Sequence, residues 1–277
     1  MTPDPASAKR DLLEFYVATG VDAALGEIAV DRLSPAQTPP AEAAIPSRPA
    51  TAQPSPRPEA PPQRTPDFAL ARAPASPDVA VMAARETARS AASLDELRSL
   101  LTKFEGCALR TTAKQLVFAD GDPQARVMFV GEAPGRDEDI AGLPFVGRSG
   151  KLLDLMIAAI GLDRTSAYIA NVIPWRPPGN RTPTPQETQI CLPFTLRQIE
   201  LANPDILVCL GGPSSQTLLG VKEGIKRTRG RWFTFQTGTR EIKAIATFHP
   251  AYLLRSPLEK RFAWRDLLAI RKALDAA

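Results

Sequence analysis

Four short apolar runs, each followed by a segment with helical periodicity, limit most strongly how this chain can fold. The apolar runs cover residues 126–130, 168–173, 206–210 and 242–248. The segments with helical periodicity cover residues 150–160, 185–202, 214–219 and 260–274. Nearly continuous apolar strands that alternate with helices are typical of a parallel sheet covered on both faces. The sequence therefore predicts an α/β domain with a central, four-stranded, mainly parallel sheet.

The first apolar run leads into a loop that combines glycine, proline and acidic residues. Its segments are Gly131-Glu132-Ala133-Pro134-Gly135, Arg136-Asp137-Glu138-Asp139 and Leu143-Pro144-Phe145-Val146-Gly147. Such a loop lies beyond the carboxyl end of its strand, where open α/β sheets bind ligands. Small residues there let backbone N–H groups approach a bound group closely. Glycine-rich turns between a strand and a helix are common, so this loop alone is weak evidence of a ligand site.

The other predicted strands end in polar or glycine-rich loops that we expect at the same edge of the sheet. They lead into Asn171 and residues 175–181, into Gly211-Gly212-Pro213-Ser214, and into His249-Pro250. His249 is the only histidine of the chain. A lone histidine is commonly structural, but a position directly after a strand favours a catalytic role. No second histidine or close set of carboxylates supplies the ligand spacing of a metal site.

Two further residues at this edge each allow a plain and a functional interpretation. Asn171 can satisfy the backbone of a turn, or its amide can read the edge of a base. Phe145 can be an ordinary core residue, or its ring can stack on a base. The residue types leave both alternatives open.

The charge of the chain is compatible with a polyanionic partner such as DNA. The net charge is +4, and a basic run next to Trp232 consists of Lys222, Lys226, Arg227, Arg229 and Arg231. Arg176, Arg181 and Arg255 add positive charge near the predicted strand ends. Such charges are often only a solvated surface, but glycines and an aromatic residue among them make phosphate contacts credible.

The chain divides into three parts by composition. Thirteen of its 28 prolines lie in residues 34–78, which hold few large apolar residues, so we expect a disordered linker there. Within residues 1–33, the pattern of residues 8–19 predicts a short amphipathic helix, and the sequence leaves open whether it docks on the main domain or recruits a protein partner. The folded domain is expected over residues 79–277. Ser76-Pro77 is expected to open its first helix, as N-cap and first helical residue.

The sequence also bears on location. No apolar run reaches the roughly 18 residues of a membrane span, and the N-terminus lacks the apolar region of a signal peptide. The three cysteines do not form the disulfide framework of a secreted protein. We therefore expect a cytoplasmic protein without a membrane partner.

Three motifs in register closely resemble the family 4 uracil-DNA glycosylases. They are the segments 131–135 with 143–147, the segment from Asn171 to Arg181, and His249-Pro250-Ala251-Tyr252-Leu253-Leu254. The likeness runs from about Phe104 to the C-terminus and leaves out the first hundred residues. It implies a three-layer α/β/α fold and a monofunctional enzyme of base excision repair. Such an enzyme flips deoxyuridine out of DNA, hydrolyses its N-glycosidic bond and leaves an abasic site.

The resemblance also assigns roles to individual residues. By position, Phe145 stacks on uracil, Asn171 reads its pyrimidine edge and His249 bonds its O2 atom. Ala133 and Asn180 lie in the matching substrate-binding segments. The loop around Leu253 and Arg255 matches the part that enters the minor groove of DNA. The residues expected to contact DNA are Arg176, Arg181, Arg229, Leu253 and Arg255.

Glu132 and Glu138 match the acidic positions of the family's first motif. Cleavage of the glycosidic bond develops positive charge on the sugar and negative charge on the base. A carboxylate near C1′ can hold the attacking water, and a donor at the base oxygen stabilises the leaving anion. Glu132 is our first choice for the carboxylate and Glu138 the second, while His249 is the expected donor.

The cysteines depart from the family pattern. Family 4 members hold a [4Fe-4S] cluster on four cysteines, and ligation requires the full set of thiolates. Here the first position is Phe104 and the third is Trp175, so only Cys107 and Cys191 remain. We therefore expect no cluster and no other cofactor, with aromatic packing in its place. Cys107 and Cys191 should lie close together as reduced thiols, and Cys209 should be a core residue.

The sequence allows two alternatives to an enzyme. A DNA-binding protein that recognises uracil or abasic sites with little turnover would keep the same surface. A general nucleotide-binding α/β protein is disfavoured because the chain has no Gly-x-x-x-x-Gly-Lys-Ser/Thr loop. The expected partner is uracil-containing DNA, bound by a monomer.

Overall fold

The computed structural model describes residues 77–276. The predicted N-terminal helix (residues 8–19) and all but the last two residues of the predicted linker (residues 34–78) lie outside the described residues. Helix α2 (Pro77–Ser90) begins at Pro77, where the Ser76-Pro77 pair predicts a helix start. Residue 79, where the folded domain is expected to begin, lies in the first turn of this helix.

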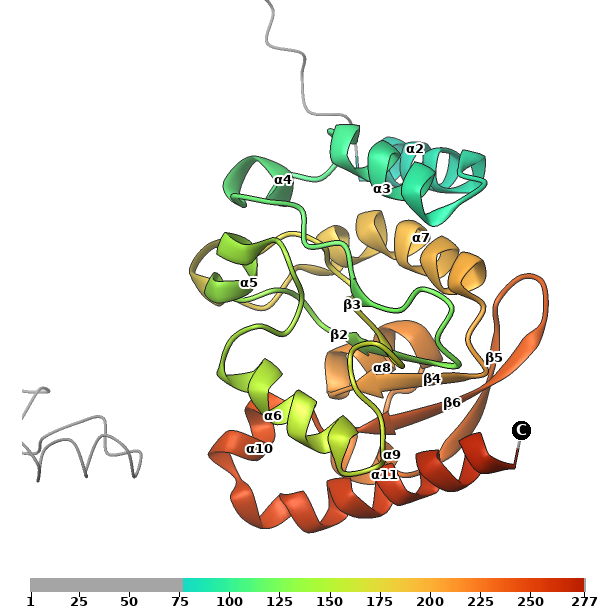
Figure 1. The fold of residues 1–277 in the computed structure, drawn as a ribbon. Coiled ribbons are helices and arrows are strands. Elements are labelled where there is room, and N and C mark those ends of the chain that lie inside the picture. The colour runs from blue at the N-terminus through green and yellow to red at the C-terminus, as the bar shows by residue number, and fades with distance from the viewer. Residues whose placement is uncertain (1–76, 277) are drawn as a thin grey trace, which may run out of the picture. The chain divides into compact units, whose positions relative to one another are not determined.

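A six-stranded sheet in the order β1-β3-β2-β4-β6-β5 forms the centre of the domain (Figure 1). Its four central strands pair in parallel, as predicted, and are β2 (Val127–Gly131), β3 (Tyr168–Asn171), β4 (Ile206–Leu210) and β6 (Glu241–Thr247). Gly131 lies opposite Asn171, and Leu210 lies opposite Thr247. This register brings the carboxyl ends of the parallel strands to one edge.

The sheet has two more strands than the sequence predicted, and both are antiparallel edge strands. They are β1 (Asp120–Gly121), paired with β3, and β5 (Trp232–Gln236), paired with β6. Strand β1 has only two residues, and most side chains of β5 are exposed or partly exposed. Neither strand therefore has the continuous apolar run that marks the central four. Trp232, expected beside a phosphate-binding run, begins β5.

Helices cover both faces of the sheet, which confirms the three-layer α/β/α architecture (Figure 1). Along β2, Met128 and Val130 pack on one face, while Val127 and Phe129 pack on the other. The first face carries α2, α3 (Leu94–Lys103), α7 (Pro185–Ala202) and α8 (Gly212–Leu219). The second face carries α6 (Arg148–Ala158), α10 (Pro250–Arg255) and α11 (Lys260–Asp275).

Short helical turns shape the connecting segments. They are α4 (Leu109–Thr112), α5 (Arg136–Ala141), η1 (Pro178–Asn180), α9 (Ile225–Thr228) and η2 (Pro257–Glu259). Helix α5 was expected to be part of a loop. Its acidic first turn, residues 137–139, suits the positive end of a helix dipole, and Gly142 ends it with a φ of 73°. Within residues 77–276, no helix is both long and apolar enough to cross a membrane.

Candidate active site

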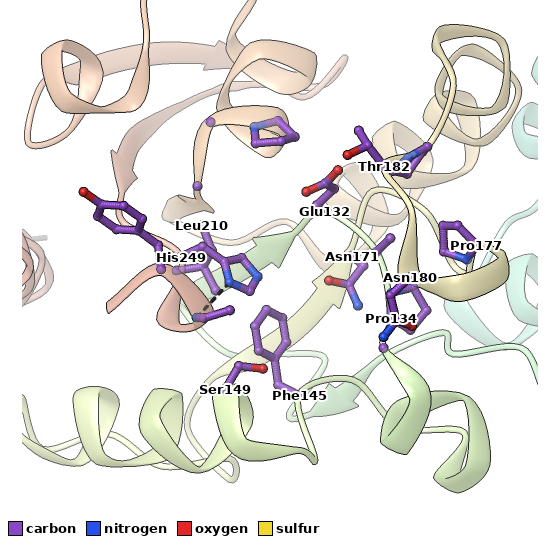
Figure 2. A pocket seen from close by; sticks show the side chains of 18 of the residues that line it. Glu132, Pro134, Phe145, Ser149, Asn171, Pro177, Asn180, Thr182, Leu210 and His249 are labelled. Atoms are coloured by element: carbon purple, nitrogen blue, oxygen red, sulfur yellow. Dashed lines mark hydrogen bonds between the residues drawn. The ribbon is translucent and has the colours of Figure 1, made fainter. Parts of the chain in front are cut away.

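A cavity of about 650 Å³ opens at the carboxyl ends of the parallel strands. Glu132 follows β2, Asn171 ends β3, and His249 stands between β6 and α10. All three line this cavity together with Phe145, which lies in the loop before α6. In Figure 2 these side chains reach into the same space from different strand ends and from the loop before α6. The structure thus brings together the four residues that the sequence predicted at one site.

Asn171 is the strongest indication of a bound ligand. The residue is only 4% exposed, and its Oδ1 atom has no hydrogen-bond partner within residues 77–276. Buried polar atoms are nearly always paired, so an unpaired one facing a cavity indicates a donor supplied by the ligand. A Cβ atom at Gly131, the residue that pairs with Asn171 across β2 and β3, would come within 2.4 Å of this Oδ1 atom. Position 131 therefore requires glycine.

The Phe145 ring forms one wall of the cavity and is 4% exposed. Its centroid lies 5.5 Å from that of the His249 ring, and the two planes are tilted by 30°. A Cβ atom at Gly131 would also come within 2.6 Å of the Phe145 ring. The glycine that ends β2 therefore makes room for both the aromatic wall and the amide.

The His249 ring is held in one tautomer. Its Nδ1 atom accepts a hydrogen bond of 3.1 Å from the Ala251 N–H, at the start of α10 (Figure 2). Burial, and to a smaller extent the charge of Arg255, lowers the pKa of His249 to about 4. The neutral ring therefore carries its proton on Nε2, which makes His249 a hydrogen-bond donor through that atom.

Glu132 and Glu138 have different surroundings. Burial raises the pKa of Glu132, whose side chain faces the cavity. Glu138 also lines the cavity, but its carboxylate accepts hydrogen bonds from the backbone N–H groups of Gly135, Val146 and Gly147, at 3.0, 3.1 and 3.0 Å. Glu138 thus ties the loop after β2 to the loop that carries Phe145. Its two oxygens already have partners, whereas Glu132 presents its carboxylate to the cavity.

Asn180 lines the cavity and is oriented by Arg176. The Asn180 Oδ1 atom accepts a 2.7 Å hydrogen bond from Nε of Arg176, so its amide N–H₂ group is left for the cavity. Asp139 lies 3.8 Å from the Arg176 guanidinium and accepts a 2.7 Å bond from the Lys114 N–H. The contact with Asn180 was not expected from the sequence, and the expected DNA contact of Arg176 stays a prediction.

Two residues expected to contact DNA differ from their prediction. Arg229 bonds the buried Asp266 carboxylate and the Phe262 carbonyl, so its guanidinium is committed to the core. Leu253, in α10, is 1% exposed and packs in the core, whereas Leu254, the next residue, is 37% exposed. The sequence identified the segment of α10 at the cavity, but it did not predict which of its side chains, Leu253 or Leu254, points to the solvent.

The remaining predicted residues lie at or near the rim. Ala133 and Arg255 line the cavity. Arg181 also lines it and pairs with Glu187 through two bonds of 2.6 and 2.8 Å, with its side chain 43% exposed. DNA contacts by Arg181 and Arg255 stay predictions.

Some lining residues were not singled out from the sequence. They include Ser149, at the start of α6, and Tyr252, in α10. Thr182 and Pro183 belong to the segment after η1. Tyr252 belongs to a motif that the sequence did identify. Ser149 follows the Phe145 loop, but an isolated serine carries no signal that separates it from other helix starts.

The cysteine region, which consists of Phe104, Cys107, Trp175 and Cys191, belongs to the core that α3 and α7 cover, and none of these residues lines the cavity. The Sγ atoms of Cys107 and Cys191 lie 3.8 Å apart and are buried. Phe104 and Trp175 are buried in the same core, and Phe104 packs edge-on against Phe194 with centroids 5.0 Å apart. Cys209 lies in β4, where burial raises the pKa of its thiol to about 12.

Comparison with known proteins gives one consistent family. The model of the Uracil DNA glycosylase superfamily matches residues 118–268. Type-4 uracil-DNA glycosylase of Archaeoglobus fulgidus is 41% identical over 169 residues, which are 60% of this chain and 85% of that protein. The Thermotoga maritima enzyme of the same name is 43% identical over an aligned region that covers 56% of this chain and 79% of that protein. The Type-4 uracil-DNA glycosylase of Saccharolobus solfataricus is 37% identical over an aligned region that covers 66% of this chain and 88% of that protein. The four predicted residues of the cavity all lie inside the matched range.

Proposed function

The chain belongs to the uracil-DNA glycosylase superfamily, and we propose that its cavity receives a deoxyuridine flipped out of DNA and hydrolyses the N-glycosidic bond. The products are free uracil and an abasic site, as the first step of base excision repair. The observation that carries this assignment is the buried Oδ1 of Asn171, which has no partner within residues 77–276, beside the Phe145 ring and the His249 donor. A pyrimidine needs this combination of a stacking face and a polar edge to remain outside the duplex.

Recognition of the base is the role proposed for Asn171 and Phe145. Uracil presents an N3–H donor beside the O4 acceptor, and the Asn171 amide offers an acceptor and a donor in return. The Oδ1 atom that lacks a partner within the described residues would accept the N3–H. The Phe145 ring would cover one face of the base, which offsets the loss of stacking in the duplex.

Bond cleavage is the role proposed for His249 and Glu132. As the C1′–N1 bond breaks, its electron pair passes to the uracil ring, and Nε2–H of neutral His249 donates to the developing O2 anion. Glu132 orients a water molecule toward C1′ and takes its proton as the C1′–O bond forms. We assign the water to Glu132 because the oxygens of Glu138 are occupied by three backbone N–H groups.

DNA contact is proposed at the rim of the cavity around α10. Leu253 anchors this helix in the core, so Leu254 is the exposed apolar side chain that can enter the minor groove. Arg255 lines the cavity, and its guanidinium can contact a phosphate beside the flipped nucleotide. Arg181 can contribute at the opposite side if its ion pair with Glu187 opens.

The residues present do not fit the [4Fe-4S] cluster that the resemblance implies, and we propose that the protein works without it. Cluster ligation needs four thiolates, whereas this region offers Cys107 and Cys191. Within residues 77–276 no group of three or more histidine, cysteine or acidic side chains could hold a metal ion. The burial of Phe104 and Trp175 in the core, and the packing of Phe104 against Phe194, support an apolar replacement.

Three further proposals concern assembly and location. We expect the enzyme to act as a monomer, since Glu132, Phe145, Asn171 and His249 of a single chain already line one cavity. The apolar positions of residues 8–19 support a protein partner for that segment. A cytoplasmic location is consistent with the free thiols of Cys107 and Cys191, which a reducing compartment would preserve.

The experiment that tests the enzyme is release of uracil from an oligonucleotide containing one deoxyuridine, under single-turnover conditions. Wild type and His249→Ala are compared, and the equilibrium binding of the same oligonucleotide is measured in parallel. We expect the wild type to release uracil and the variant to release it about 100-fold more slowly or worse. Tight binding by the wild type with release no faster than that of the variant would instead support a DNA-binding protein.

A further inference from the structure

The backbone of Phe145 adopts a conformation that its side chain disfavours. Its φ is 54°, in the left-handed region that bulky residues rarely occupy. Such a conformation persists only where the surroundings hold it in place, and it is commonly found at functional sites. The neighbouring residues must therefore fix this peptide, and with it the direction of the ring.

Arg164 makes the contacts that can do so. Its guanidinium donates to the carbonyl of Pro144, at 3.1 Å, and to the carbonyl of Phe145. The same guanidinium is held by two carboxylates, Asp154 of α6, at 2.9 Å, and Asp120 of β1. Arg164 thus connects the edge strand and α6 to the two carbonyl groups on either side of the Phe145 N–H and Cα.

A glycine closes the other side of the Phe145 carbonyl. A Cβ atom at Gly150, in the first turn of α6, would lie 1.7 Å from that oxygen. The carbonyl is therefore enclosed between the α6 backbone and the Arg164 guanidinium. Together these contacts leave the Phe145 peptide one orientation.

We propose that Arg164 is a positioning residue for uracil excision, which acts by holding the Phe145 ring where the flipped base stacks. This inference deepens the proposed function and rests on the stacking role of Phe145. Arg164 is not among the residues that line the catalytic cavity, so its influence on the base passes through the Pro144 and Phe145 carbonyls. Its carboxylate partners orient the fork of the guanidinium, which a lysine could not reproduce.

A double-mutant cycle tests this role. Single-turnover uracil release is measured for wild type, Arg164→Met, Phe145→Ala and the double variant, and inhibition by free uracil is measured for each. A displaced ring is expected to slow release by Arg164→Met about 10- to 100-fold, since a shift of about 1 Å can cost that much. In the Phe145→Ala background the same substitution should change release less than about twofold, because no ring remains to be positioned.

Arg240→Met is the matched control. Arg240 also bonds the carbonyl of a residue with positive φ, Asn203, and that of the adjacent Pro204, at 2.8 and 2.9 Å. Neither Arg240 nor Asn203 lines the catalytic cavity. This variant should resemble Arg164→Met in thermal stability while keeping wild-type uracil release and wild-type inhibition by uracil.

The outcomes separate the inference from the function on which it rests. Equal losses from Arg164→Met in both backgrounds, or none in either, would overturn the positioning role. Full activity of Phe145→Ala would instead refute the stacking role of Phe145. If Arg164→Met does not fold, Asp154→Asn takes its place, because it weakens the anchor at a half-exposed side chain. The inference is supported if the substitution slows uracil release in the protein with Phe145 and not in the Phe145→Ala variant. Any other result overturns it.

Discussion

Two titratable side chains of the cavity are shifted toward their neutral forms by burial. Burial raises the pKa of Glu132 and lowers that of His249 to about 4. For His249 this is the useful direction, because a neutral ring with its proton on Nε2 can donate throughout the neutral range. For Glu132 the raised pKa makes the carboxylate a better proton acceptor, but the carboxylate is lost sooner as the pH falls.

The pH dependence of the rate should therefore report Glu132. We expect single-turnover uracil release to fall as the pH decreases through a value above 4.5, the ordinary pKa of a glutamate. Glu132→Gln should be slower by a factor of about 100 or more and should lose this acidic limb. His249 should add no inflection near 6.5, since its pKa is lowered to about 4. An inflection near 6.5 in both proteins would contradict these assignments.

Arg176 and Arg255 should differ in how they affect DNA binding. The Arg176 guanidinium bonds Asn180 and lies near Asp139, whereas Arg255 faces the rim. We expect Arg255→Met to reduce the slope of log affinity against log salt by about 1, as loss of a phosphate contact does. Arg176→Met should leave that slope unchanged and lower the rate of uracil release. Identical changes of slope in the two variants would show that Arg176 also contacts phosphate.

Several contacts of the site could not be found from local sequence. His249 was identifiable as the lone histidine after a strand, whereas the roles of Asn171 and Phe145 were left open by their residue types and followed from the family motifs. Arg164 was not, because its carbonyl and carboxylate partners lie 10 to 44 residues away in the chain. The contact of Arg229 with Asp266, 37 residues away, likewise depends on tertiary packing.

At the scale of elements, the connection between β2 and α6 determines the shape of the cavity. Glu138, in the short helix α5, accepts hydrogen bonds from backbone N–H groups in the segments of this connection before and after α5. The sequence predicted a loop here because a helix of six residues is too short to show a period. The four parallel strands were predictable since their apolar runs are buried on both faces, whereas β1 and β5 lack that pattern.

Glu138→Gln should therefore destabilise the protein, and Glu132→Gln should not. An amide presents one acceptor oxygen, so at least one buried N–H of the three would lose its partner. Since hydrogen bonds to a charged group contribute about 1.5–3 kcal/mol, we expect a loss of about 2 kcal/mol in the free energy of unfolding. Denaturation by urea measures the difference between the variants. Equal stability of the two would mean that Glu138 does not hold the loops together.

At the scale of the whole molecule, the domain keeps the family architecture while its cysteine region is packed with side chains. Phe104, Trp175 and Phe194 are buried in the same hydrophobic core as Cys107 and Cys191, and the Phe104 ring packs against that of Phe194. Aromatic burial of this kind can hold these segments together without metal ligation. The sequence revealed the missing cysteines by comparison with the family motif, but only the structure shows that the rings pack in the core.

The purified protein should accordingly be colourless and contain less than one iron per chain, even when it is prepared without oxygen. Iron analysis and the visible spectrum measure this directly, and treatment with an iron chelator should change neither the thermal melting nor the rate of uracil release. A broad visible absorption with about four irons per chain would contradict the proposal.

The arrangement of Glu132, Phe145, Asn171 and His249 around one pyrimidine-sized cavity is the central claim. A crystal structure of the protein with free uracil tests it most directly. We expect the uracil ring to lie against Phe145, with N3 within hydrogen-bonding distance of Asn171 Oδ1 and O2 facing His249 Nε2. Uracil bound elsewhere, or bound here with its polar edge turned away from Asn171, would contradict the account.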